Sequence, residues 1–116
     1  MEKKSTEKFT FELPHCKVEN CHFVATRYQE PKNLALLVEN DNNETVAVCS
    51  VNPKRFKGDS VLCVKEWSEN QGMLDFLVKH KIVTRKYAWF DSEESGFVVI
   101  NAYELDDKGK ELFAGV

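Results

Sequence analysis

The stretch 60–83 constrains the fold of this chain more than any other. It opens with a β-prone run, Val61 to Val64. Ser68 then stands three residues before Gln71, which is the spacing of a helix capping box. Apolar residues follow at helical spacing, namely Met73, Leu74, Phe76, Leu77 and Val78. The cations at 79–81 suit the negative end of a helix dipole. The stretch therefore predicts a strand followed by one capped helix, the clearest helical pattern in the chain.

The other apolar runs have strand patterns separated by turn signals. Strands are predicted over 9–13, 18–29, 34–39, 45–51, 85–90 and 97–103. Turn-forming residues at 40–43 and 91–96 predict that 34–51 and 85–103 are hairpins. No βαβ rhythm is present, which disfavours a parallel sheet. We therefore expect an α+β fold, with an antiparallel β-sheet of five to seven strands curved around one central α-helix. An all-β barrel decorated by that helix is the alternative.

The chain length fits a single domain. A length of 116 residues leaves no room for two independent cores. Residues 1–8 and about 108–116 are expected to be frayed, with room for one helical turn over 110–113. No apolar run approaches the length of a membrane-spanning helix. The first residues lack the apolar segment of a signal peptide, so we expect a cytoplasmic protein that makes no membrane contact.

One segment holds donor groups of the types that bind zinc: His15, Cys16, Cys21 and His22. Its Cys-x4-Cys spacing is wide, and no second closely spaced pair follows. Strand alternation would also place Cys16 and Cys21 on opposite faces, where they cannot share one ion. Without an export signal, the cysteines are expected to be reduced thiols. We therefore expect no metal site, and a zinc protein remains a third hypothesis for function.

No motif in the sequence assigns an enzymatic activity. The chain lacks a serine nucleophile elbow, a phosphate-binding loop, a dinucleotide fingerprint and a metalloprotease helix. A cysteine nucleophile needs a base within hydrogen-bond reach, and adjacent residues such as His15 and Cys16 point apart in a strand. His80 is explained more simply by its place at a helix C-terminus. We therefore expect a protein with no catalytic residues and no cofactor.

Charged residues mark two candidate binding surfaces. The loop Lys54, Arg55, Phe56 and Lys57 places three cations around an aromatic ring, as in proteins that bind nucleic acid. The formal net charge of -3 argues against a general affinity for nucleic acid, and short charge runs are often only solvated. Acidic residues at strand ends would suit a basic protein partner, although each turn is also explained by solubility or edge protection. These are Glu39, Asp41, Glu44, Asp91, Glu93, Glu94, Glu104, Asp106 and Asp107.

Three stretches together resemble a known type of domain: NLALLVENDNNETVAVCSVN, VLCVKEWSENQGMLDFLVKHKIV and GFVVINAYEL. The resemblance is to a family of small uncharacterised domains carried on bacterial plasmids, conjugative elements and prophages. It spans about residues 33–105, and its more specific parts are Ser68 to Leu74 and Tyr103 to Leu105. The family carries no established activity or catalytic residues to transfer. It also does not explain the segment 15–22.

What the resemblance implies is a mobile-element context. In that context, a small acidic domain without a catalytic motif suggests an accessory protein that acts by binding. The leading hypothesis is a non-catalytic inhibitor of a host defence protein, of the anti-CRISPR type. It would block a basic nucleic-acid channel or a protein interface of a nuclease. The alternative is a small nucleic-acid-binding or plasmid-maintenance module that uses the loop 54–57.

Overall fold

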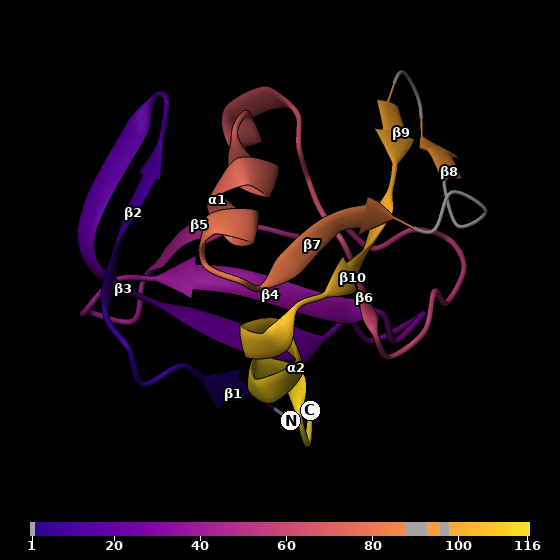
Figure 1. Cartoon of the computed structure of the whole chain (residues 1–116), viewed down its shortest axis with the longest axis horizontal. Helices are drawn as coiled ribbons and strands as arrows, with labels where there is room; N and C mark the ends of the chain where they lie inside the picture. The colour runs from indigo at the N-terminus through magenta and orange to yellow at the C-terminus, as the bar shows by residue number, and fades with distance from the viewer. Residues whose placement is uncertain (1, 88–92, 96–97) are drawn as a thin grey trace.

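The structure is a computed structural model that describes residues 2–87, 93–95 and 98–116 (Figure 1). Within these residues the chain forms antiparallel strand pairs and two short α-helices. The predicted α+β class and antiparallel pairing are therefore confirmed. None of the helices in the described ranges is long and apolar enough to cross a membrane.

The larger sheet is built around one long strand. Its described members are β1 (Lys3–Lys4), β2 (Phe9–Leu13), β3 (Cys16–Arg27), β4 (Leu34–Glu39) and β5 (Thr45–Val48). The strand β3 pairs with β2, then with β1, and over its second half with β4. The pairing of Leu37 with Val48 joins β4 to β5 and confirms the hairpin predicted over 34–51. This leaves β5 as a terminal strand of the sheet.

A smaller sheet contains three described strands in the order β6, β10, β7. Their bounds are β6 (Val61–Cys63), β7 (Val83–Tyr87) and β10 (Ala102–Leu105). Tyr103 pairs with Tyr87, which confirms that the predicted strands over 85–90 and 97–103 meet. An isolated bridge between Ser50 and Val64 links this sheet to the larger one. The prediction of one continuous sheet is therefore wrong: the described strands form separate sheets, and this isolated bridge joins the two larger ones.

A separate strand pair has one strand inside the predicted turn and the other inside the strand predicted over 97–103. It consists of β8 (Glu93–Ser95) and β9 (Val98–Ile100). The turn predicted over 91–96 is therefore wrong for 93–95, which are extended. The other residues of that turn, and the end of the strand predicted over 85–90, lie outside the described residues.

The helix α1 (Met73–Lys79) begins later than predicted, and the capping box is wrong. Ser68 belongs instead to a short 3-10 turn, η1 (Ser68–Asn70), and makes no side-chain cap. The residue before the helix is Gly72, whose φ of 91° suits a residue without a Cβ. The chain therefore turns sharply between η1 and α1.

The position of α1 also differs from the prediction of a central helix. It buries Met73, Phe76 and Leu77, which confirms the apolar stripe. It packs beside the sheets, against β2 and β7 (Figure 1). A helix of seven residues is only about 10 Å long, too short for a sheet to wrap around. Strand residues supply most of the buried hydrophobic cluster in the described chain.

Both ends of the chain are more ordered than the predicted fraying. Near the N-terminus, Lys3 pairs with Ala25 of β3. At the other end, the helix α2 (Asp107–Phe113) buries Leu112 and Phe113. The two ends lie side by side, and the Nζ of Lys3 donates to the carbonyl of Glu111 at 2.7 Å (Figure 1). Tertiary contacts therefore order segments whose local sequence is weakly structured.

Candidate functional site

The segment with zinc-type donors forms part of β3, and a bulge there changes which side chains share a face. Phe9 pairs with Cys21, whereas Phe11 pairs with Val18, so β3 carries one extra residue in this interval. The extra residue brings Cys21 to the same face as Cys16, and both pack on the hydrophobic core. The prediction of opposite faces was wrong because strict alternation holds only for an unbroken ladder.

The donor groups of this segment interact with protein neighbours. The Nε2 of His22 lies 3.1 Å from the Oε1 of Glu39, which is also 3.2 Å from the Nζ of Lys4. The four cysteines are free thiols, and burial raises the pKa of Cys21 and Cys49. Among the described residues, no group of three or more His, Cys, Asp or Glu side chains is arranged to hold a metal ion. The buried imidazole of His22 is instead satisfied by a polar network.

The acidic turn between β4 and β5 is partly neutralised. The side chain of Glu39 is only 12% exposed in its network with Lys4. Asp41 forms an ion pair with Lys8 at 2.6 Å. Glu44 is exposed and accepts a hydrogen bond from the Nδ2 of Asn40 at 3.1 Å. In these contacts Glu39 and Asp41 are each paired with a lysine, whereas Glu44 is paired with the amide of Asn40.

The other proposed acidic residues lie on different elements. Glu104 of β10 is 4.0 Å from the Nζ of Lys86. The carboxylate of Asp106 accepts from the backbone N–H of Asp107 at 2.8 Å at the N-cap of α2. Glu93 and Glu94 lie in β8, and Asp91 lies outside the described residues. Asp106 therefore caps the N-terminus of α2, whether or not it also contacts a partner.

One buried amide holds the basic loop in place. The Oδ1 of Asn33 accepts from the backbone N–H of Lys57 at 2.7 Å. Its Nδ2 donates to the carbonyl of Arg55 at 3.0 Å and to the Oδ1 of Asn52 at 2.9 Å. Asn33 is 3% exposed, so these bonds are shielded from water. The loop is therefore anchored to the start of β4.

The anchored loop exposes three of its four predicted binding residues. Lys54 and Arg55 are exposed, and Phe56 is 52% exposed. Lys57 is buried. A nucleic acid would therefore meet Phe56 and its two preceding cations, while Lys57 belongs to the loop's packing.

An apolar groove of about 330 Å³ lies beside β5. It is lined by Phe11, Leu13, Cys16, Thr45, Val46, Ala47, Val48, Lys65, Glu69 and Asn70. Val48 is 41% exposed, which is high for a valine in a strand. Its carbonyl accepts from the Nδ2 of Asn70 at 2.7 Å, so this carbonyl faces away from β4. The groove therefore combines apolar side chains with the outer edge of a strand.

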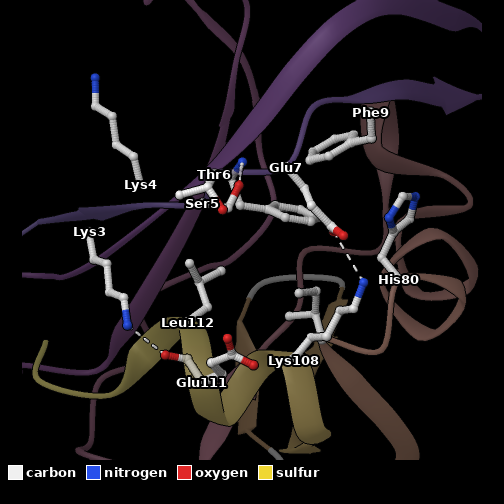
Figure 2. A pocket seen from close by; sticks show the side chains of 12 residues that line it. Lys3, Lys4, Ser5, Thr6, Glu7, Phe9, His80, Lys108, Glu111 and Leu112 are labelled. Atoms are coloured by element: carbon white, nitrogen blue, oxygen red, sulfur yellow. Dashed lines mark hydrogen bonds and ion pairs between the residues drawn. The ribbon is translucent and has the colours of Figure 1, made fainter.

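A second cavity, of about 310 Å³, lies between the N-terminal segment and α2 (Figure 2). Phe9 and Phe23 line it, with ring centroids 4.5 Å apart. The ring of His80 lies 5.0 Å from that of Phe9. Burial, followed by the charges of Lys79 and Lys108, lowers the pKa of His80. This shift favours the neutral form of the imidazole.

Neither the groove nor the cavity is signalled by the sequence. His80 is predicted there only as a residue at a helix end, and Phe9 only as part of the apolar face of a strand. The groove and the cavity form because distant segments meet, and no local spacing signals that meeting. Lys108 was even placed in the tail expected to be frayed.

Comparisons with known proteins returned no relatives: no family model, no curated protein and no solved structure matches the chain.

Proposed function

We propose that this chain is a non-catalytic accessory protein of a mobile genetic element that binds and inhibits a host defence protein in the cytoplasm. The inhibition would be of the anti-CRISPR type. The mobile-element context rests on the resemblance of residues 33–105 given above. The observation that supports action by binding is the outer edge of β5, which lies beside an apolar groove.

The edge of β5 suits an extended partner segment. An edge strand offers backbone N–H and C=O groups to an added strand. Here the strand is Thr45–Val48. Asn70 already occupies the carbonyl of Val48, so an added strand would pair with the other outward backbone groups, and the exposed Val48 side chain offers apolar surface as well. Phe11 and Leu13 supply apolar lining for a side chain of the partner. We therefore assign the contact to an extended segment with alternating apolar side chains.

The charge near this edge favours a basic partner. Glu44 directly precedes β5 and is exposed. Lys8 offsets the charge of Asp41, so Glu44 would supply most of the attraction. Basic segments line the nucleic-acid channels of nucleases because they neutralise phosphates. Binding of such a segment to β5 would remove it from the nuclease's substrate.

The first test is capture of a partner. The protein is used to pull down binding proteins from a nuclease-treated lysate of bacteria with active CRISPR and restriction systems. Recovery of a defence nuclease, followed by loss of its activity when the purified proteins are mixed, is the expected result. Failure to recover or inhibit any defence protein would contradict the proposed function.

A variant pair then tests the assignment to β5. Val48→Lys places a charge at the groove and is expected to weaken binding of the captured partner about tenfold or more. Val99→Lys is the matched control, because Val99 of β9 is 50% exposed and does not line the groove. Equal affinities of the two variants would refute the docking site while leaving inhibition itself intact.

A second candidate function is supported by the basic loop. Phe56 is exposed next to Lys54 and Arg55 on a loop that Asn33 anchors. A base can stack on such a ring while the cations contact phosphates. Fluorescence anisotropy with labelled single-stranded DNA and RNA would show binding that weakens steeply with salt and is reduced by Phe56→Ala. Salt-independent binding, or no effect of Phe56→Ala relative to Val99→Ala, would exclude this mode.

A further inference from the structure

The cavity between the N-terminal segment and α2 has an aromatic and apolar lining. The rings of Phe9 and Phe23 lie 4.5 Å apart, and the His80 ring lies 5.0 Å from Phe9. Ile82, which directly precedes β7, and Leu112 of α2 add aliphatic surface. A flat ring packs well against such a lining, because offset and tilted ring contacts are favourable. The lining therefore selects for a ligand with a flat apolar body.

Three described lysines line the cavity, and Lys108 is the one best placed to hold a ligand charge. Lys3 donates to a carbonyl of α2, and Lys4 extends away from the other labelled side chains (Figure 2). The Nζ of Lys108 lies 3.1 Å from the Oε2 of Glu7. Figure 2 shows this pair on the same side of the cavity as His80. A cation therefore stands next to the aromatic lining and already binds a carboxylate.

We propose that this cavity binds a small organic anion that carries one carboxylate on a flat apolar ring system. The ring lies against Phe9 and Phe23, and the carboxylate takes the place of Glu7 on Lys108. A volume of about 310 Å³ is at the small end of ligand pockets, which restricts the ring system to one or two fused rings. The site is independent of the groove at β5 and of the function proposed above.

Glu7 has a specific role in this site. Its carboxylate holds the same Nζ that the ligand needs, so it competes with the ligand from within the chain. Both side chains are largely exposed, at 74% for Glu7 and 52% for Lys108, so their ion pair is weak and exchangeable. Removing Glu7 should strengthen ligand binding, whereas removing the charge of Lys108 should weaken it. A purely apolar pocket would show neither effect.

The probe is 1-naphthoate, added to the full-length ¹⁵N-labelled protein and followed by two-dimensional NMR. Saturable shifts of backbone amides are expected at Thr6, Glu7, Lys108 and Leu112. Naphthalene-1-methanol is the uncharged counterpart and is expected to bind about tenfold more weakly, because it lacks the charge that Lys108 recognises. No saturable shift at millimolar naphthoate, or shifts confined to other parts of the chain, would overturn the proposal.

Two variants separate the charge effect from a structural one. Lys108→Gln is expected to weaken naphthoate binding about tenfold. Glu7→Gln is expected to tighten it about two- to fivefold. Lys8→Gln is the matched control, because Lys8 is also about half exposed and ion-paired but does not line the cavity. If Lys108→Gln retains a native spectrum and binds naphthoate as tightly as Lys8→Gln does, the assigned carboxylate site is wrong.

Discussion

Replacing Gly109 with alanine tests whether the C-terminal helix is docked on the segment that follows α1. A Cβ at Gly109 would meet the backbone carbonyl of Ile82 well inside van der Waals contact. The backbone N–H groups of Lys108 and Gly109 donate to the carbonyl of Lys81 at 3.1 and 3.2 Å. The backbone N–H of Asp106 donates to the carbonyl of Ile82 at 2.9 Å. The backbone of α2 therefore lies directly on 81–82, and only glycine allows this approach.

Two opposing effects set the size of the change. Alanine is favoured over glycine in a helix by about 1 kcal/mol. Overpacking costs about 1–3 kcal/mol, and here the neighbour is backbone that cannot swing aside. Relief requires α2 to move, which exposes part of Leu112 and Phe113, each worth about 1.5–3 kcal/mol when fully buried. We expect a net loss of about 2 kcal/mol in the free energy of unfolding, and a fall of about 8–12 °C in Tm.

The assay is urea unfolding followed by circular dichroism, with a thermal scan in parallel. Lys110→Ala is the control, because Lys110 is exposed in the same helix and alanine should change its stability little. A frayed tail would respond in the opposite way, since alanine would then be neutral or stabilising. A Gly109→Ala protein as stable as the parent would therefore refute the docking of α2 on 81–82.

Three further predictions concern other parts of the described chain. Asn33→Ala should lower the free energy of unfolding by about 2–4 kcal/mol in urea titrations, because it leaves the loop's buried backbone groups unpaired; a change below that of a surface variant would contradict the anchoring role. Cys16 is partly exposed and should react with a thiol reagent in the native protein. Cys49 is buried, which also raises its pKa, so it should react only after unfolding. Mass spectrometry of the labelled peptides shows which of the two cysteines has reacted, and labelling of Cys49 in the native protein would contradict its burial. Burial lowers the folded-state pKa of His80, so the unfolded chain takes up the proton at a higher pH than the folded chain does. The folded state with a neutral His80 is therefore fully stable above about pH 6.5, and it loses stability relative to the unfolded state as the pH falls below that value. His80→Gln should flatten the stability profile below about pH 6.5, and an unchanged slope in urea titrations would refute this effect.

Most of the local structure follows from short-range pattern. The apolar run at 34–39 and the turn at 40–43 correctly predicted the hairpin of β4 and β5. The apolar stripe correctly identified the buried residues of α1. These predictions hold because strand and helix periodicities are properties of neighbouring residues. The start of α1 was missed because Ser68 lies in a separate turn and Gly72 resets the chain direction.

The arrangement of these elements depended on contacts between distant residues. The strand β10 lies between β6 and β7, and the sequence indicated only its pairing with β7. The bulge in β3 places Cys16 and Cys21 on the same face instead of on opposite faces, because one extra residue shifts every side chain after it. Docking on 81–82 ordered a tail that looks frayed when judged by its own composition.

The candidate sites depend on tertiary contacts more than the secondary structure does. Sequence pattern alone predicts the class of fold, the main strands, the apolar face of α1 and a charged loop that contains an aromatic ring. The folded chain is needed to show that Phe56 is exposed and Lys57 buried, that Glu39 is held by Lys4, and that Lys108 meets Glu7 beside an aromatic cavity. The physical reason is that periodicity is set by neighbours along the chain, whereas burial, ion pairing and cavities are set by which segments meet in space.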